Sequence, residues 1–392
     1  SNLLTGSLSG NVGKLSILSQ LCLDNNHLEG VLPVELGLLE NLTTLTLSSN
    51  HFNGRIPPEL GNCSQLATLD LGNNMLSGEI PGIFGKLPVL DCLVLSHNQL
   101  SGRIPEKVCS VSKEFNMPDS MFTQHFGVLD LSFNRLTGPI PNRIGNCSVL
   151  VNLLLQGNQL SGPIPEELSL LYNLTTLDLS ENALTGSIPP SFGKLGRLQG
   201  LNMAFNLLQG TIPLELGEVT SLVKLNVTHN ELSGSLPVTL GRLTGLTHLD
   251  VSYNKLEGEI PAEYSKMVSI VGFYLGSNKL RGGISDLLTE SIVWHQVQAL
   301  DLSGNMFDDT IPKSLGNLSS LSYLDLHRNR FSGPIPAELG ELSQLAYLDL
   351  SENHLSGEIS LNLCDLDVLT FLNFSGNKLE GEVPEEGICA KL

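Results

Sequence analysis

The sequence predicts a solenoid of the α/β class, built from about sixteen coils of near 24 residues that stack a parallel sheet along one face. Three observations support this prediction: a 24-residue repeat covers the chain, apolar residues alternate over short segments, and glycine and proline recur at fixed positions. The composition agrees, because a 392-residue chain that is 41% hydrophobic and 16% charged is too apolar to be disordered. We therefore expect one repetitive domain rather than two or three globular ones.

An asparagine marks each coil. It follows a Leu-x-Leu-x-x pattern and recurs every 24 residues, except for a step of 36 after Asn98 and one of 27 after Asn278. Its side chain can bond the backbone of its own turn and of the neighbouring coil, as a buried polar group requires. These repeat asparagines are Asn2, Asn26, Asn50, Asn74, Asn98, Asn134, Asn158, Asn182, Asn206, Asn230, Asn254, Asn278, Asn305, Asn329, Asn353 and Asn377.

The rest of each coil keeps the same phase. Alternating leucines, as in Leu45 and Leu47, predict a short strand with one face inward. Four residues after the asparagine a glycine permits a turn with positive φ, and Asp309, the one exception, is among the better substitutes. A proline lies seven residues after the asparagine in thirteen repeats. Since one coil cannot bury its apolar face alone, the stacked strands should form a parallel sheet over a leucine core.

Charge and motifs exclude several functions. The balance of 21 basic and 40 acidic residues gives a net charge of −19, which disfavours nucleic acid and favours a basic protein partner. No run of 18 apolar residues predicts a membrane span, and the first ten residues lack signal-peptide features. Phosphate-loop and kinase signatures are absent, as are Cys-x-x-Cys and His-Glu-x-x-His spacings. We expect no enzyme in this segment, no cofactor and no metal site.

The unit at residues 42–57, LTTLTLSSNHFNGRIP, resembles the plant-specific leucine-rich repeat of receptor kinase ectodomains, and this resemblance spans all sixteen units. It implies a right-handed leucine-rich-repeat solenoid with the parallel sheet on its concave face. On this view residues 1–392 form a single solenoid, the C-terminal part of a longer array, with a short insertion loop at 112–126 and a C-terminal cap at 378–392.

The irregular segments resemble the excess-microsporocytes receptor group, which is related to the brassinosteroid receptors and acts in anther development. They are Met117–Ser120, Gln124–Val128, Ser285–Leu288 followed by Trp294, and Gly387–Cys389. The resemblance implies an ectodomain on the extracellular face of the plasma membrane. It would bind a small secreted cysteine-rich protein of the tapetum-determinant type and recruit a shorter leucine-rich-repeat co-receptor of the somatic-embryogenesis type.

Two other functions remain open on the same repeat. One is a secreted inhibitor of microbial wall-degrading enzymes, although such inhibitors are usually shorter and carry both terminal caps. The other is a receptor-like protein without a kinase, which these residues cannot separate from a receptor kinase. Any kinase domain would lie outside this segment.

Ligand contacts are expected on outward strand positions and in the insertion, because the inward positions are leucine. Aromatic residues and arginine are enriched in binding hot spots. The alternative interpretation is that some of these residues merely cover neighbouring side chains. The candidate ligand-binding residues are Phe115, Met117, Phe122, Phe133, Phe205, Tyr253, Tyr274, Tyr323, His327 and Arg328. By analogy with related receptors, the co-receptor should meet the last repeats and the cap at Tyr347, His354, Phe371 and Lys378.

Two charged features have competing interpretations. Aspartate often stands four residues before the repeat asparagine, either as an acidic stripe for a basic ligand or as repeat consensus that bonds nearby backbone, and the second is favoured. Arg328 and Arg330 resemble a paired-arginine motif that holds a peptide carboxylate in some related receptors. Because Arg330 follows the repeat asparagine, it should leave the strand face, so only Arg328 is expected to bind a ligand carboxylate. The aspartates are Asp70, Asp130, Asp178, Asp250, Asp301, Asp325 and Asp349.

Cysteines and sequons suit a secreted chain. Cys364 and Cys389 lie eleven and twelve residues after their repeat asparagines, so we predict a disulfide that clamps the C-terminal end. Cys63 and Cys147 are expected to be small buried hydrophobes, and Trp294 to lie in the core beneath a longer convex helix at 286–296.

A glycan on Asn226 would obstruct the concave surface. The predicted glycosylation sites are Asn41, Asn62, Asn146, Asn173, Asn226, Asn317 and Asn373.

Overall fold

The computed structural model describes residues 2–108, 127–288, 294–385, 387 and 389. They fall into two compact units, an N-terminal unit of residues 1–207 and a C-terminal unit of residues 208–392, and each is described by itself. The insertion at 112–126, with Phe115, Met117 and Phe122, lies outside the described residues. The expectation of a single domain over 1–392 stays a prediction.

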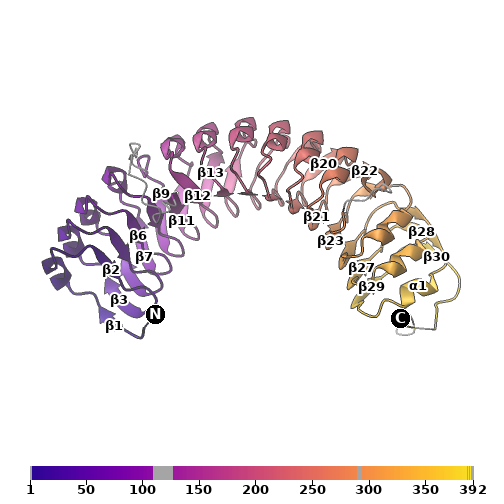
Figure 1. Cartoon of the computed structure of the whole chain (residues 1–392), viewed down its shortest axis with the longest axis horizontal. Coiled ribbons are helices and arrows are strands. Elements are labelled where there is room, and N and C mark those ends of the chain that lie inside the picture. Colours follow the sequence, from indigo (N-terminus) through magenta and orange to yellow (C-terminus); the bar gives the residue numbers. More distant parts are fainter. Residues whose placement is uncertain (1, 109–126, 289–293, 386, 388, 390–392) are drawn as a thin grey trace. The chain divides into compact units, whose positions relative to one another are not determined.

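In the N-terminal unit, parallel strands form two sheets, a major one on the inner side and a minor one beside it (Figure 1). The major sheet runs in the order β2 (Gln20–Cys22), β4 (Thr44–Thr46), β6 (Thr68–Asp70), β8 (Cys92–Val94), β10 (Gly127–Asp130), β12 (Leu150–Leu154), β14 (Thr176–Asp178) and β16 (Gly200–Asn202). The minor sheet runs in the order β1 (Thr5–Ser7), β3 (His27–Val31), β5 (His51–Gly54), β7 (Met75–Glu79), β9 (Gln99–Arg103), β11 (Arg135–Gly138), β13 (Gln159–Pro163) and β15 (Ala183–Thr185).

The C-terminal unit repeats this arrangement. Its major sheet runs in the order β17 (Lys224–Asn226), β19 (His248–Asp250), β21 (Gly272–Tyr274), β23 (Ala299–Asp301), β25 (Tyr323–Asp325), β27 (Tyr347–Asp349) and β29 (Phe371–Asn373). Its minor strands are β18 (Ser233–Ser235), β20 (Lys255–Gly258), β22 (Lys279–Gly282) and β24 (Met306–Phe307), then β26 (Ser332–Gly333), β28 (His354–Gly357) and β30 (Lys378–Leu379). All of these pairs are in parallel register, so the predicted coil is confirmed in both units.

The other side of each coil carries short helical turns rather than long α-helices. Most begin directly after a proline, such as Pro57 or Pro336. This proline is extended, its φ is fixed by its ring, and the 3-10 turn starts at the next residue. They are η1 (Gly10–Lys14), η2 (Val34–Leu38), η3 (Pro58–Asn62), η4 (Phe84–Lys86), η5 (Asn142–Asn146), η6 (Glu166–Leu170), η7 (Pro190–Lys194), η8 (Leu214–Glu218), η9 (Val238–Arg242), η10 (Ala262–Lys266), η11 (Ser285–Leu288), η12 (Lys313–Asn317), η13 (Ala337–Glu341) and the α-helix α1 (Leu361–Cys364).

The repeat asparagines hold neighbouring coils together as predicted. The side-chain amide of Asn50 donates to the carbonyl of Leu47 at 3.1 Å in its own coil and to that of Leu23 at 2.9 Å in the preceding coil. Its side-chain oxygen accepts the backbone N–H of Leu28 at 3.0 Å. Asn50 therefore satisfies buried backbone groups of neighbouring coils at once, and the later repeat asparagines make the same kind of bonds.

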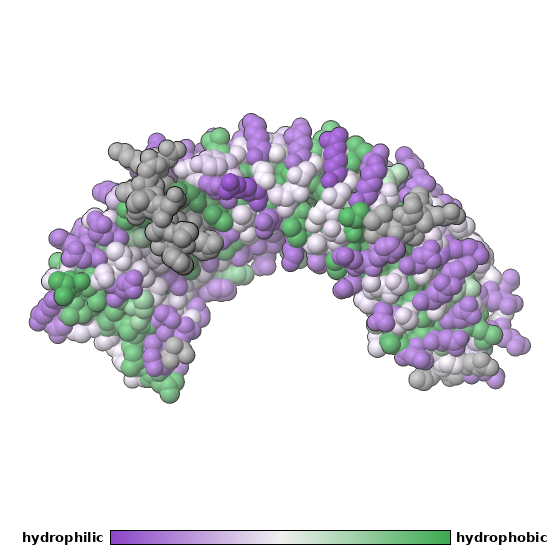
Figure 2. All heavy atoms as spheres, in the orientation of Figure 1, coloured by the Kyte–Doolittle hydropathy of each residue, from purple (hydrophilic) through white to green (hydrophobic). Residues whose placement is uncertain are grey.

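Leucine fills the space between sheet and turns, and each coil depends on its neighbours for that burial. Leu39 is fully buried, whereas Leu15, one repeat earlier, is 51% exposed because it lies in the first coil. Figure 2 shows apolar surface at this end of the N-terminal unit, where Leu3 and Ile17 are also exposed. Burying one such side chain stabilises a fold by roughly 1.5–3 kcal/mol.

Positive φ occurs at two places in most of the described coils, and the sequence predicted one of them. Gly54, four residues after its asparagine, has φ 75° as expected, but Asp309 does not adopt a positive φ. Its carboxylate accepts the N–H of Thr310 at 2.8 Å. Asp309 thus avoids the left-handed conformation, which is unfavourable for a residue with a Cβ atom. The residue just before each asparagine is also left-handed, even where it is a large one such as Phe133 at 51°.

The irregular C-terminal features have definite packing. Trp294 is 1% exposed, donates its indole N–H to the Tyr264 carbonyl at 3.3 Å and lies 5.0 Å from the ring of Phe273, which confirms its core position. Of the longer helix predicted at 286–296, the described residues form only the 3-10 turn Ser285–Leu288, and residues 294–296 are not helical. Within the described residues, none of the helices is long and apolar enough to cross a membrane.

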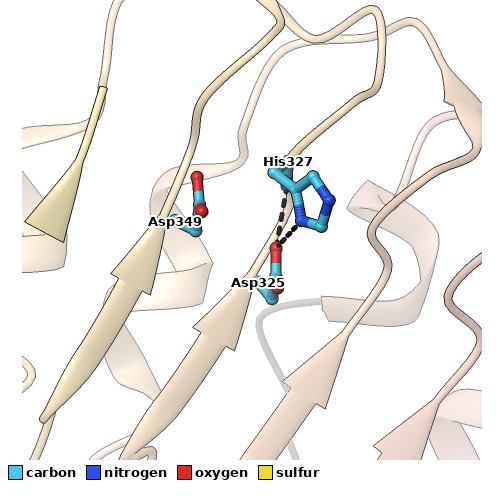
Figure 3. Close-up of side chains that lie close together, drawn as sticks. All are labelled: Asp325, His327 and Asp349. Atoms are coloured by element: carbon cyan, nitrogen blue, oxygen red, sulfur yellow. Dashed lines mark hydrogen bonds and ion pairs between the residues drawn. The ribbon is translucent and has the colours of Figure 1, made fainter. Parts of the chain in front are cut away.

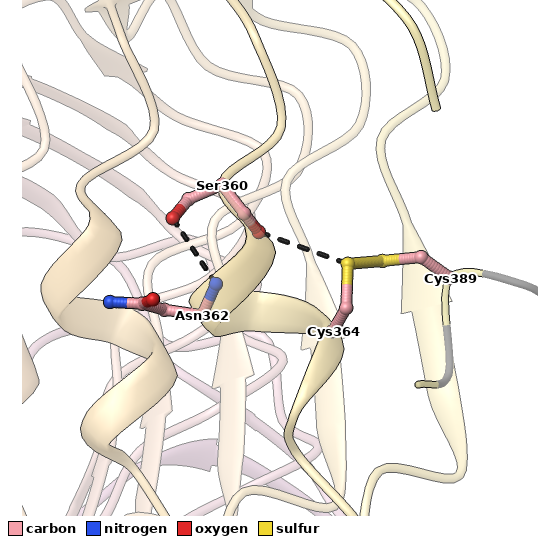
Figure 4. Close-up of a disulfide and its surroundings, with 4 residues drawn as sticks. All are labelled: Ser360, Asn362, Cys364 and Cys389. Carbon is pink, nitrogen blue, oxygen red and sulfur yellow. Dashed lines mark hydrogen bonds between the residues drawn. A yellow bond between two sulfur atoms is a disulfide. The ribbon is translucent and has the colours of Figure 1, made fainter. Parts of the chain in front are cut away.

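The cysteines followed the predictions in all but one case. Cys364 and Cys389 form the predicted disulfide, with Cα atoms 5.2 Å apart (Figure 4). Cys63 is buried and free, and its thiol donates to the Leu36 carbonyl at 3.3 Å. The prediction for Cys147 is wrong in part: the residue is buried, but it is disulfide-bonded rather than a free small hydrophobe. Burial by repeat phase could not distinguish these two states.

Candidate ligand-binding surface

Each strand of the major sheet presents its second set of side chains to solvent, and we call this side the strand face. Outward residues stand six, four and two positions before the repeat asparagine, since side chains alternate along a strand. The left-handed residue directly before the asparagine adds a further outward side chain. These positions recur at matching register in neighbouring strands, so they form rows across the sheet.

The aspartate row bonds local backbone, as favoured from the sequence. The carboxylate of Asp301 accepts the N–H of Ser303 at 2.9 Å, and that of Asp349 accepts the N–H of Ser351 at 2.9 Å. Asparagine serves equally at this position, because Asn373 accepts the N–H of Ser375 at 3.1 Å. The row therefore supports the turn after each strand, whatever else it binds.

Three rings in the row six residues before the asparagine form an aromatic stack in the C-terminal unit, consisting of Tyr323, Tyr347 and Phe371. Tyr323 and Tyr347 have centroids 4.4 Å apart at 14°, and Tyr347 and Phe371 are 4.3 Å apart at 5°. The stack joins one predicted ligand residue to two predicted co-receptor residues on a single surface. His354 and Lys378 instead lie on the minor strands β28 and β30, where both are exposed.

Below the stack, Asp325, His327 and Asp349 come together (Figure 3). The carboxylate of Asp325 lies 2.7 Å from Nδ1 of His327 and accepts the Tyr323 hydroxyl at 3.2 Å. Oxygens and nitrogen of the three side chains lie within 4.8 Å of one another, which a metal site would require. Sequence spacing could not reveal this group, because Asp349 belongs to the next strand. Hydrogen bonds account for its arrangement, and we assign no metal to it.

Apart from His327 beside Asp325, the described residues give the negative charge on this part of the strand face no basic partner. Among the described residues, no lysine or arginine forms an ion pair with Asp250, Asp301, Asp325 or Asp349. Burial, together with the charge of Asp325, raises the pKa of the Asp301 carboxyl. Burial also raises the pKa of Tyr274, with contributions from Asp250 and Asp301. Asp301 and Tyr274 therefore give up their protons less readily than the same groups in water.

The arginines behave as the sequence indicated, with one addition. Arg328 is exposed beside the strand face, but its Nε bonds the carboxylate of Glu352 at 2.8 Å, so a ligand carboxylate would have to compete with that pair. Arg330 follows the repeat asparagine Asn329, and its backbone N–H donates to the Phe307 carbonyl at 2.8 Å. Capture of a carboxylate by both arginines is not supported.

The remaining candidates are distributed between the units. Phe133 and Phe205 belong to the N-terminal unit and Tyr253 and Tyr274 to the C-terminal unit, so the two pairs are described separately. Phe133 stacks on His97 with centroids 4.5 Å apart. Tyr253 stacks on His229 at 4.1 Å. Neither histidine is among the residues predicted from the sequence, although both stand at the same repeat position as Phe133 and Tyr253, directly before an asparagine.

Four sequon asparagines need separate mention because of their place in the coil. Asn226 and Asn373 lie in strands β17 and β29 on the strand face, as predicted. Asn41 and Asn173 precede strands, and their amides donate to carbonyls of the preceding coil at 2.9 and 3.0 Å. The other three sites are exposed at the ends of helical turns, namely Asn62, Asn146 and Asn317.

Comparisons with known proteins place this surface in context. The family model described as "Leucine rich repeat" matches residues 295–355. A second model, described as "Leucine Rich Repeat", matches residues 41–63, 65–87, 127–147, 149–171, 173–195, 221–243, 245–267 and 368–388. A stretch of 40 residues is 60% identical to the leucine-rich repeat receptor protein kinase MSP1 of Oryza sativa subsp. japonica, and covers 10% of this chain and 3% of that protein.

Two solved plant receptor structures are similar over nearly the whole chain. The peptide hormone receptor RGFR1 in complex with RGF2 is 33% identical with a TM-score of 0.87, covering 97% of this chain and 62% of that one. The Arabidopsis receptor kinase HAESA, in complex with the peptide hormone IDA and the co-receptor SERK1, is 33% identical with a TM-score of 0.82, covering 100% of this chain and 67% of that one. This chain thus spans less than two thirds of the RGFR1 structure. Its repeats and these likenesses show that it belongs to the leucine-rich-repeat family, in the form found in plant receptor kinases.

Proposed function

We propose that this chain is part of the extracellular ectodomain of a plant receptor kinase and that it perceives a secreted protein or peptide ligand. The observation that carries the proposal is the aromatic stack of Tyr323, Tyr347 and Phe371. These rings lie on the solvent side of the sheet, outside the leucine core, and Phe371 is 40% exposed. Aromatic side chains held in register on a rigid sheet supply contact area at low entropic cost, which suits a recognition surface.

The complexes of similar receptors support this proposal. RGFR1 was solved with RGF2, and HAESA with IDA and SERK1. By this likeness the chain would bind its ligand on the strand face and recruit a shorter leucine-rich-repeat co-receptor. The aromatic stack would then contribute to both contacts, since it joins predicted residues of each kind.

Ligand and co-receptor would be recruited together for a physical reason. An interface of stable complexes buries about 1,200–2,000 Å², and a partner that buries less binds weakly. A ligand on the strand face adds surface next to the last coils, so the co-receptor meets receptor and ligand at once. Binding of the ligand is thereby converted into receptor dimerisation.

The finer identity is also a proposal. We infer that the ligand is a small basic cysteine-rich protein of the tapetum-determinant type and that the receptor belongs to the excess-microsporocytes group of anther development. A net charge of −19 supports a basic partner. The 60% identity with rice MSP1 over 40 residues supports a kinship with that receptor.

A binding screen tests the proposal. The chain would be immobilised and presented with recombinant secreted cysteine-rich proteins, RGF-type and IDA-type peptides, and microbial wall-degrading enzymes. We expect one cysteine-rich protein to bind and then to bring a SERK-type ectodomain into a ternary complex on size-exclusion chromatography. Binding of a wall-degrading enzyme alone would favour the inhibitor function instead.

A matched pair of variants locates the contact. Tyr347→Thr removes the middle ring of the stack and should weaken ligand or co-receptor binding about tenfold, as truncation of an aromatic hot spot does. Tyr172→Thr changes an exposed tyrosine outside the strand face and should leave both affinities unchanged. Equal effects of the two variants would contradict a role for the stack.

We also propose N-glycans on the seven sequons. Asn62, Asn146 and Asn317 are exposed at the ends of helical turns, which makes these sites accessible for modification. A glycan on Asn226 would cover part of the strand face around β17, so ligand contacts should avoid that strand. Glycopeptide mass spectrometry of the chain secreted from plant cells tests each site. An unmodified Asn226 would remove this restriction on the ligand.

A further inference from the structure

On the β23 side the aromatic stack ends at the ring of Tyr323. In register, the residue opposite Tyr323 on strand β23 is Ala299, whereas on strand β27 it is Tyr347. Among the described residues, the ring of Tyr323 accordingly stacks on Tyr347 and on no ring from the β23 side. The row therefore leaves a flat tyrosine face beside a small alanine on an otherwise rigid sheet.

A carboxylate without a donor from the preceding strand, that of Asp301, stands next to this face. In another coil, the hydroxyl of Ser48 donates to Asp70 of the following strand at 2.8 Å. At the equivalent place before Asp301 the chain has Gly276, which offers no hydroxyl. A Cβ on Gly276 would lie only 2.9 Å from the Asp301 carboxylate. The glycine therefore leaves space beside this carboxylate, and it has no side chain that could donate a hydrogen bond to it. Its donors come from Ser303 alone among the described residues.

Basic groups of the chain itself do not supply the missing partner. Arg328 is bound to Glu352, and Lys255 to Glu231. His327 faces Asp325 rather than Asp301. Asp301 and Asp325 lie side by side on β23 and β25, and among the described residues no arginine or lysine pairs with either of them. Asp325 is buried and bonds His327 and Tyr323, so Asp301 is the carboxylate that is left for a ligand.

An arginine side chain matches this combination of groups. Its planar guanidinium stacks on an aromatic face and donates several N–H bonds in a fixed fork to carboxylates. An ammonium is a compact, strongly hydrated charge and uses the flat ring less well. We propose that the Tyr323 ring face beside Ala299, together with the carboxylate of Asp301, forms a seat for an arginine of the protein ligand, and that the charge of the neighbouring Asp325 adds to the attraction. This inference rests on the proposed function, because it names the ligand chemistry that the strand face recognises.

The seat can be tested without knowing the ligand. The probe is acetyl-Gly-Arg-Gly-amide, with the citrulline and lysine tripeptides as controls, titrated into the chain and followed by saturation-transfer difference NMR. We expect the arginine peptide to bind in the millimolar range, the lysine peptide about threefold more weakly, and the uncharged citrulline peptide at least tenfold more weakly. Equal binding of the arginine and citrulline peptides would overturn the proposal, and equal binding of the arginine and lysine peptides would overturn its assignment to guanidinium.

Variants separate the seat from the general negative charge of the chain. Asp301→Asn should weaken the arginine peptide about tenfold, and it should fold, because Asn373 makes the same turn bond at the same repeat position. Glu263→Gln removes an equal charge from the exposed helical turn η10 and should change the affinity less than twofold. An equal loss in both variants would show attraction by net charge only and would refute the seat.

A second variant tests the seat independently, in case Asp301→Asn does not fold. Tyr323→Thr removes the ring and introduces a residue that the same row already holds at Thr44, Thr68 and Thr176. It should weaken the arginine peptide about fivefold, whereas Tyr172→Thr should have no effect. Unchanged affinity in Tyr323→Thr would refute the role of the ring.

A final arm links the seat to the ligand found in the screen. Each arginine of that protein is replaced by glutamine, and its affinity is measured for the wild-type chain and for Asp301→Asn. One replacement should cost about tenfold against the wild type and less than twofold against the variant, as a double-mutant cycle requires for a direct pair. Additive losses for every arginine would contradict the proposal. A screen without any ligand would count against the proposed function, while the peptide titration would still decide the seat.

Discussion

At the scale of single residues, the chain uses one polar side chain in each coil to join neighbouring coils. Asn353 is 4% exposed and donates its amide to the carbonyls of Leu326, Leu350 and Ser351 at 2.9, 3.1 and 3.1 Å. Its side-chain oxygen accepts the N–H of Phe331 at 3.0 Å. Because water cannot reach these groups, the asparagine is required by the backbone rather than by a ligand.

Replacing this asparagine should be costly. Asn353→Ala leaves buried backbone groups of two coils without partners, so we expect a loss of about 2–4 kcal/mol in the free energy of unfolding. Urea unfolding followed by circular dichroism measures it. The matched control is Asn62→Ala, at an exposed site, which should cost less than about 0.5 kcal/mol. A loss below about 1 kcal/mol for Asn353→Ala would contradict the role given to the asparagine.

Asp301 gives a prediction for pH. Its pKa is raised in the folded chain by burial and by Asp325, so the folded state favours the protonated carboxyl. Stability from this group is fully present below its ordinary value of 3.8 and is lost as the pH rises through the raised folded value. Asp301→Asn should therefore raise the unfolding temperature at pH 7 relative to the wild type, and the difference should disappear near pH 3.

Differential scanning fluorimetry between pH 3 and pH 7 measures this difference. Glu263→Gln, which removes an exposed charge, serves as the control and should shift the curve little at any pH. A lower unfolding temperature of Asp301→Asn at pH 7 would mean that the ionised carboxylate stabilises the fold, contrary to the direction of its pKa.

At the scale of elements, the repeat phase predicted strands and turns well but missed what interrupts or closes them. Leucine alternation located the strands of the major sheet, because inward side chains repeat every two residues. It did not reveal that the residue before each asparagine is left-handed, since large residues such as Phe133 are unusual there. It also gave no sign of the disulfide at Cys147, because burial and phase look the same for a free and a bonded cysteine.

The terminal disulfide is the main restraint of the last coil. It joins α1 to residues that follow β30 across a separation of 25 residues, and closing a loop of that length stabilises by about 3 kcal/mol in the chain-entropy description. Cys364→Ser with Cys389→Ser should therefore loosen β29 and β30 first, because coils of a solenoid open from their ends.

Hydrogen exchange read by mass spectrometry measures the loosening. We expect faster exchange over Phe371–Asn373 and unchanged exchange over His248–Asp250, which lies several coils away in the same unit. Cys22→Ser, a change at an exposed free cysteine, is the control and should change neither segment. Uniform acceleration over the C-terminal unit would show that the disulfide stabilises more than the last coil.

At the scale of the whole molecule, net charge governs how a partner arrives. The chain carries −19, and the aspartates of the C-terminal strand face add a local negative region that has no lysine or arginine partner among the described residues. A basic ligand would be attracted over about a Debye length, near 10 Å at 0.1 M salt, and less so as salt screens the field.

Association kinetics test this steering. For the ligand identified by the screen, the association rate should fall about tenfold between 50 and 500 mM NaCl, while the dissociation rate changes little. Surface plasmon resonance measures both rates. Glu263→Gln should reduce the association rate only slightly, as one charge among many. A rate that does not depend on salt would contradict electrostatic attraction of a basic ligand.

The sequence by itself determined the coil, its core and the positions of its outward residues. A strict 24-residue phase leaves one inward set of leucines and one buried asparagine, and local geometry then follows from alternation and hydrogen bonding. It also determined the Cys364–Cys389 bond, because equivalent positions on adjacent coils must lie close together. Tertiary structure alone decided which outward residues meet: the rings of Tyr323, Tyr347 and Phe371, the Asp349 carboxylate beside His327, and Asp301 beside Gly276. These residues stand a full repeat apart in the chain, and only the stacking of strands in register brings their side chains into contact.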